Sequence, residues 1–114
     1  MLLFKKKFLA AIRAGEKTQT IRLWPFRRMK PGQRSYIPGA GYIRILAVDE
    51  IVLAELSDAD ARPDGFATAA ALHAELNGLY AAQLAAGQQA YRIRFELLSP
   101  SEQIDAAAAR RARR

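Results

Sequence analysis

The sequence predicts a single α+β domain, a small mixed β-barrel of about five to six strands with two flanking helices. Three observations favour this fold class. The chain has 114 residues, enough for one ordinary domain and too few for two. Its hydrophobic fraction of 51% and charged fraction of 25% are typical of soluble globular proteins. Segments of alternating apolar residues surround two segments whose apolar residues have helical spacing.

The first part of the chain predicts a short strand, a helix and a second strand. Residues 2–4 are apolar and form the first candidate strand. From about Lys6 the spacing is helical, and Gly15 lies where a helix end favours a left-handed residue. Residues 18–24 alternate and are rich in β-branched side chains, which predicts a strand that ends at Pro25.

The middle of the chain predicts two further strands. Residues 30–33 (Lys-Pro-Gly-Gln) are a turn signature and precede a short strand at 35–37. A second glycine- and proline-rich turn at 38–41 leads into a long strand over 42–53. The alternation breaks at Asp49-Glu50, where we expect a bulge or bend.

The last part predicts a loop, a helix, a strand and a tail. Residues 57–65 are polar and form the loop, and Thr68 is a candidate N-cap for a second helix that ends before Gly87. Residues 89–98 alternate again and form the last strand. Residues 100–114 are expected to be a helical or frayed basic tail, disordered at least in part, that contacts polyanions without specificity.

The charge is unevenly distributed along the chain. The formal net charge is +7, with ten bases and one acid in residues 1–34, against four bases and eight acids in residues 35–99. A basic half beside an acidic half is typical of surfaces that bind phosphate or nucleic acid, so we expect a nucleic-acid or nucleotide partner. The alternative is that the positive charge only keeps the protein soluble.

Composition excludes several kinds of chemistry. Without cysteine there is no disulfide, thiolate zinc site or cysteine nucleophile. His73 is the single histidine, which excludes a multi-histidine metal centre, and we expect it to be an ordinary boundary residue of the second helix. Asp58 and Asp60 are a weak metal signal, so neither a metal nor another cofactor is predicted.

We expect a cytoplasmic protein with no membrane partner. No apolar run approaches the ~20 residues of a spanning helix. At the start of the chain the apolar residues precede the basic cluster Lys5–Lys7, which is the reverse of a signal peptide. The three lysines could extend a phosphate-binding surface or could be ordinary surface charge at the start of a helix.

The segment 15–24 has the densest set of polar side chains. Because strand side chains alternate, one face of it collects Thr18, Thr20 and Arg22. Gln19, Ile21 and Leu23 share the other face, and the two apolar residues predict that this face packs on the core. Lys17 can meet Thr20 only if it belongs to the turn after Gly15 rather than to the strand. The polar face is either a cradle for an anion or a base edge, or an exposed strand surface.

Aromatic and basic residues are interleaved further along the chain. The set comprises Trp24, Phe26, Arg27, Arg28, Lys30, Arg34 and Tyr36. Such interleaving suits stacking on unpaired bases together with phosphate contacts. The alternative is that the tryptophan and tyrosine belong to the core and the cations to a solvated loop.

The motif and the order of elements resemble a known family, the ASCH domain, a relative of the PUA RNA-binding fold. The matching stretch is Phe8-x-x-x-Ile12-x-x-Gly15-x-Lys17-Thr18-x-Thr20-Ile21-Arg22. The turn at 30–32, the second helix and the final strand also follow in the order of that family. The resemblance covers about residues 2–98, and we place an ASCH domain at 1–99 and the basic tail at 100–114.

The resemblance implies a PUA-like barrel with a basic cleft beside the first helix. Together with the charge pattern it predicts that the cleft binds RNA or a nucleotide. The predicted contact residues are Lys17, Thr18, Thr20, Arg22, Trp24, Arg27, Arg28 and Lys30.

One branch of the family is similar to 4-acetylcytidine amidohydrolase, which gives the alternative function. In that branch a threonine replaces an acid, as Thr20 does here, and the resemblance implies Thr20 as nucleophile and Lys17 as its activating base. The glutamate of the branch corresponds to Asp64, whose side chain is about 1.5 Å shorter. A lysine acts as a base only when its pKa falls, which a nearby arginine favours and an aspartate opposes.

A ribonuclease is a third possibility. It needs a general acid and a general base, and these cannot be assigned when His73 is the single histidine.

Overall fold

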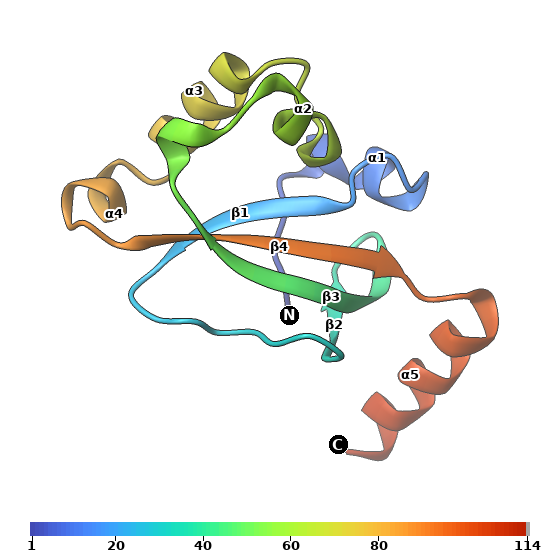
Figure 1. Ribbon diagram of the computed structural model, residues 1–114. Coiled ribbons are helices and arrows are strands. Elements are labelled where there is room, and N and C mark those ends of the chain that lie inside the picture. The colour runs from blue at the N-terminus through green and yellow to red at the C-terminus, as the bar shows by residue number, and fades with distance from the viewer. Residues whose placement is uncertain (114) are drawn as a thin grey trace.

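A computed structural model describes residues 1–113 as a curled four-stranded antiparallel sheet with helices around it (Figure 1). The strands, in the order β1-β4-β3-β2 across the sheet, are β1 (Gln19–Trp24), β4 (Gln89–Leu97), β3 (Gly41–Ile51) and β2 (Arg34–Ile37). The helices are α1 (Leu9–Arg13), α2 (Asp58–Ala61), α3 (Ala69–Leu79), α4 (Ala81–Ala85) and α5 (Pro100–Ala112). Short 3-10 turns lie at Lys6–Phe8, Leu53–Glu55 and Arg62–Asp64.

The two faces of the sheet bury separate apolar clusters, which is why the strands alternate. Ile93, Ile43 and Ile45 belong to the cluster on one face and are fully buried. On the other face Ile21 and Leu23 pack with side chains of α2 and α3, as the alternation of this strand predicts. The α+β class is therefore confirmed.

The predicted strand count of five to six is wrong, because residues 1–113 form four strands. Residues 2–4 run beside β2 with one backbone hydrogen bond, from the Leu2 amide to the Tyr36 carbonyl at 3.1 Å. At Leu3 the carbonyl instead accepts a hydrogen bond from the Arg22 side chain. A run of three apolar residues can pack against a sheet without pairing as a strand, so the composition of residues 2–4 does not by itself predict a strand.

The predicted bulge in β3 is displaced from its expected position. The pairing of β3 with β4 shifts register between Ile45 and Ala47, leaving Leu46 as the extra, exposed residue. Asp49 and Glu50 instead pair regularly with β4 and face solvent. The bulge bends the strand and helps to curl the sheet.

The prediction of two helices is also wrong, because the described chain has five. The first helix begins as a 3-10 turn and ends before Gly15, whose φ of 75° confirms the predicted helix end. The N-cap at Thr68 is confirmed by its side chain, which accepts from the Ala71 amide at 3.1 Å. The second helix is interrupted at Tyr80 and becomes α3 and α4, and the expected loop at 57–65 folds into α2 and a 3-10 turn. None of the helices described within residues 1–113 is long and apolar enough to cross a membrane.

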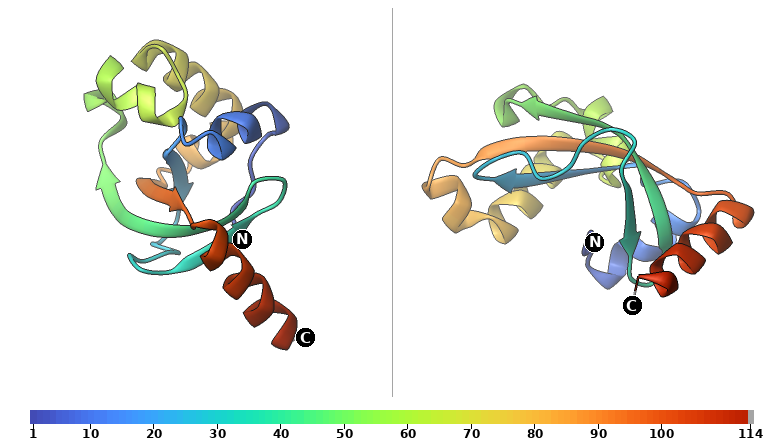
Figure 2. Two further views of the ribbon diagram at one scale, coloured as in Figure 1. Left: turned by 90° about the vertical axis from the view of Figure 1, so that its right-hand side faces the viewer. Right: turned by 90° about the horizontal axis from the view of Figure 1, so that it is seen from below.

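The C-terminal segment is a helix over 100–112, which confirms the helical alternative for this tail, and the expected disorder of its arginines is wrong for the described residues. Ser99 caps α5 with a capping box. Gln103 holds the helix against the sheet: its Nε2 donates to the Tyr42 carbonyl at 2.7 Å, and its Oε1 accepts from the Tyr42 amide at 2.8 Å. Figure 2 shows α5 extending away from one end of the sheet. Arg114, the last residue of the predicted tail, lies outside the described residues.

Replacing Gln103 by alanine is expected to detach α5. The Tyr42 amide would lose its partner, and the Tyr42 carbonyl would lose one donor while keeping the Leu98 amide at 3.1 Å, at a cost of roughly 1–3 kcal/mol. In the variant, hydrogen exchange of the α5 amides should be faster than in the unmodified protein, whereas exchange in the central strands should not change. The control is Gln83→Ala, because the Gln83 side chain makes no hydrogen bond within the described residues. Equal α5 protection in the two variants would contradict this role of Gln103.

Candidate functional site

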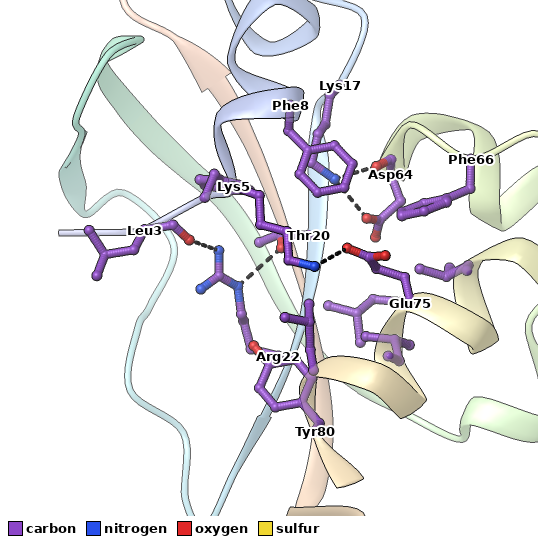
Figure 3. A pocket seen from close by; sticks show the side chains of 15 residues that line it. Leu3, Lys5, Phe8, Lys17, Thr20, Arg22, Asp64, Phe66, Glu75 and Tyr80 are labelled. Atoms are coloured by element: carbon purple, nitrogen blue, oxygen red, sulfur yellow. Dashed lines mark hydrogen bonds and ion pairs between the residues drawn. The ribbon is translucent and has the colours of Figure 1, made fainter.

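A pocket of about 400 Å³ lies at the outer edge of β1, between the N-terminal segment 3–8 and α3 (Figure 3). It forms there because β1 is an edge strand and its free side faces other elements. Much of the wall is aromatic, formed by Phe4, Phe8, Phe66 and Tyr80. Six charged or hydroxyl-bearing aliphatic side chains also line it, namely Lys5, Lys17, Thr20, Arg22, Asp64 and Glu75.

Lys17 and Asp64 form a buried ion pair at the inner end of the pocket. The Lys17 Nζ lies 2.7 Å from Asp64 Oδ1, and each residue is 3% exposed. The strand begins at Gln19, and the Lys17 amide donates to the Ala11 carbonyl at 3.1 Å. This confirms that Lys17 belongs to the turn after Gly15.

The shorter aspartate reaches Lys17 because its backbone lies close to the strand. The Thr18 amide donates to the Pro63 carbonyl at 2.9 Å, which holds the Arg62–Asp64 turn against the start of β1. Lys17 also donates to the backbone carbonyl of Asp64. Gln19 Nε2 donates to Asp64 Oδ2 at 3.3 Å and fixes the other carboxylate oxygen.

Burial lowers the pKa of the Lys17 ammonium below its ordinary value. The removal of this group from water is the largest cause, the Asp64 carboxylate opposes it, and the positive charge of Arg22 adds to the lowering. The rings of Phe8, Phe66 and Phe4 surround the ammonium at centroid distances of 4.8, 5.9 and 5.7 Å. Sequence alone leaves the sign of this shift open, and in the folded protein desolvation outweighs the aspartate.

Thr20 and Arg22 form a second polar pair on the same side of the pocket. The Arg22 Nε donates to Thr20 Oγ1 at 3.1 Å, and another guanidinium nitrogen donates to the Leu3 carbonyl at 2.7 Å. The guanidinium lies 4.7 Å from the centroid of the Phe4 ring. Burial also lowers the pKa of Arg22. Within residues 1–113 no carboxylate lies within 4.0 Å of this guanidinium, so it can accept an anionic ligand.

Glu75, on α3, forms ion pairs with the N-terminal segment on the other side of the pocket. Its carboxylate lies 3.0 Å from the Lys5 Nζ and 3.3 Å from the Lys7 Nζ, and the hydrogen bond from Lys5 is the main cause of its lowered pKa. These ion pairs connect the N-terminal segment to α3. Leu3 and Leu79 line the pocket and are exposed at 65% and 45%.

The other predicted contact residues lie elsewhere. Thr18 lines a separate hollow with Asp60 and Arg94. Trp24 is 8% exposed and packs on Tyr91 at a centroid distance of 5.4 Å, which favours the core alternative.

The loop between β1 and β2 holds three cations. The Arg27 side chain donates to the Val48 carbonyl at 2.7 Å, Arg28 lies over the exposed Phe26 ring, and Lys30 faces solvent. The structure therefore brings together Lys17, Thr20, Arg22 and Asp64 at the pocket and leaves these loop cations outside it.

Sequence reasoning missed several residues that line the pocket or support its buried ion pair. Gln19 lies on the predicted core face of its strand and gave no sign that it would bind a carboxylate. Glu75 is one residue on the predicted second helix, and its contact with Lys5 joins parts of the chain 70 residues apart. Phe66, two residues after Asp64, was the nearest available signal, because ligand pockets combine aromatic side chains with a few polar groups.

The comparisons with known proteins bear on the fold. No family model and no curated protein matches the chain. Among solved structures it is similar to the hypothetical protein PH0355, with a TM-score of 0.71, 16% identity, and coverage of 84% of this chain and 95% of that one. It is also similar to protein EF3133 from Enterococcus faecalis V583, described with the family model DUF984, with a TM-score of 0.63, 18% identity, and coverage of 81% and 70%. At these identities the likeness is one of fold alone.

Proposed function

We propose that this chain is an ASCH-type, PUA-like domain whose pocket binds a nucleotide, either free or within RNA. The observation that supports this most directly is a pocket of about 400 Å³ with aromatic walls and the Arg22 guanidinium, which has no carboxylate within 4.0 Å among residues 1–113. Pockets for small organic ligands have volumes of about 300–1,000 Å³ and combine apolar walls with a few polar groups.

The base and the phosphate of a nucleotide each have a chemical counterpart in the pocket. The rings of Phe8 and Phe66, packed edge to face at a centroid distance of 5.7 Å, offer an apolar surface for a base. Arg22 offers charge-assisted hydrogen bonds to a phosphate oxygen. The Thr20 hydroxyl, which accepts from Arg22, can donate to the polar edge of the base. Arg27, Arg28 and Lys30, which lie outside the pocket, stay candidates for phosphate contacts of a longer strand.

The substitution Arg22→Gln tests this proposal. Loss of the guanidinium should weaken the binding of cytidine monophosphate at least about tenfold, because a charge-assisted hydrogen bond contributes about 1.5–3 kcal/mol. Isothermal titration calorimetry measures the affinity, and thermal unfolding checks that the variant is folded. Arg28→Gln is the matched control, since it removes the same charge from an exposed loop. Absence of nucleotide binding to the unmodified protein, or equal losses in the two variants, would contradict the proposal.

A second candidate function, deacylation of a modified nucleoside such as 4-acetylcytidine, is favoured by the lowered pKa of Lys17 in the same pocket as Thr20. In this reaction the neutral Lys17 amine accepts the hydroxyl proton as Thr20 Oγ bonds to the acyl carbon. The C–N bond then breaks, and the Lys17 ammonium returns the proton to the leaving amine. Water hydrolyses the resulting threonine ester and releases the acid. Asp64 positions Lys17 for both transfers.

A further inference from the structure

A second hollow, of about 320 Å³, lies between α5 and the β2–β3 hairpin. Its charged and aromatic lining consists of Arg34, Tyr36, Tyr42, Arg110 and Arg113. No acidic residue is among those described as lining it. Figure 2 shows α5 beside the end of the sheet that holds these strands, away from α3.

The hollow is built by one face of α5 and one pair of strand residues. Helix positions 106, 109, 110 and 113 share a face, and the two small alanines among them leave space beneath the arginines. Tyr36 and Tyr42 are opposite each other in the register, with ring centroids 4.9 Å apart. The Arg110 guanidinium lies 4.5 Å from the Tyr36 centroid and is thereby held over the hollow.

Few carboxylates lie near the arginines of the hollow in the described part of the chain. Within residues 1–113 no carboxylate lies within 4.0 Å of the guanidinium of Arg110 or Arg113. Arg34 is 3.8 Å from Glu102, and that carboxylate is shared with Arg44. Guanidinium groups beside aromatic rings match a chain of phosphates with unpaired bases, because the cations bind phosphate and the rings stack on bases.

The N-terminal segment connects this hollow to the first pocket. Met1 lines the hollow and Leu3 lines the pocket, while the Leu2 amide between them is bonded to the Tyr36 carbonyl. Two residues of extended chain span roughly 7 Å. One continuous strand of nucleic acid can therefore reach both places.

We propose that the hollow beneath α5 binds the phosphates and an unpaired base that flank the nucleotide held in the pocket, so that the ligand of this chain is single-stranded RNA rather than a free nucleoside. This inference rests on the proposed function of the pocket. It adds a second contact site on a separate part of the fold.

The test compares a labelled oligocytidylate of about ten nucleotides with cytidine monophosphate. Arg110→Gln and Arg113→Gln should each weaken oligonucleotide binding about tenfold in fluorescence anisotropy and reduce the salt slope by about one. Both should leave the affinity for cytidine monophosphate unchanged. Arg111→Gln is the matched control, because Arg111 is on the same helix but does not line the hollow, and it should change the affinity by less than about twofold.

The outcomes separate the inference from the proposed function. Equal weakening by Arg111→Gln and Arg113→Gln would overturn the inference, since attraction by general positive charge would explain it. An oligonucleotide that binds no more tightly than cytidine monophosphate would also overturn it, while leaving the pocket proposal intact. Failure of both ligands to bind the unmodified protein would instead refute the pocket proposal. Arg110→Gln could also weaken binding by loosening α5, because it removes the contact with Tyr36. Arg113→Gln does not have this side effect, because among the described residues the Arg113 side chain forms a hydrogen bond only within its own helix.

Discussion

Replacing Asp64 by alanine is expected to lower the free energy of unfolding by about 3–5 kcal/mol. The Lys17 ammonium is 2% exposed in its side chain and would lose its only carboxylate partner within the described residues. Burying an unpaired charge is among the largest costs that a single substitution can impose. Urea denaturation measures the loss, and the fluorescence of Trp24, the single tryptophan, follows the transition.

Two further variants distinguish loss of the ion pair from other effects of the substitution. Asp105→Ala removes an exposed carboxylate from α5 and should change stability by no more than about 0.5 kcal/mol. The double variant Lys17→Met with Asp64→Leu removes both charges and should recover most of the loss, because an apolar pair of similar volume avoids the desolvation cost. If the double variant is as unstable as Asp64→Ala, the buried charge is not the cause.

Thr20→Ala is expected to abolish release of cytidine from 4-acetylcytidine if the pocket is an amidohydrolase site. Removal of a nucleophile lowers kcat by a factor on the order of 10⁶. Thr20→Ser should retain measurable turnover, because the serine hydroxyl can form the same ester. The measurement is the rate of cytidine release at saturating substrate. Equal rates in the two variants would exclude Thr20 as the nucleophile.

The matched control is Thr18→Ala, which removes a threonine hydroxyl two residues away that lines a different hollow. It should leave turnover unchanged, whereas Lys17→Ala should abolish it. The pH dependence gives an independent readout of the base. Because burial lowers the pKa of Lys17, kcat/KM should rise with pH, with a midpoint below 10.5, as the ammonium loses its proton. A rate independent of pH up to 10.5 would contradict a lysine base.

Much of the local structure could be predicted because it depends on neighbouring residues. The alternation of 18–24 placed Ile21 and Leu23 in the core, and Thr68 marked a helix start. Gly15 predicted the turn to which Lys17 belongs, before the strand begins. The number of strands was not predictable in this way, because whether residues 2–4 form a ladder depends on what lies beside β2.

The α+β class, the two periodicities and the residue types available for chemistry follow from the amino-acid order, since spacing and turn residues act over a few positions. Long-range packing was needed to bring Asp64 to Lys17 from 47 residues away and to leave Arg22 without a carboxylate within 4.0 Å among the described residues. It also decided that desolvation outweighs the aspartate at Lys17. Burial and long-range pairing depend on how distant segments pack together. The spacing rules used on the sequence act over a few residues, so they do not predict which distant side chains meet or how deeply they are buried.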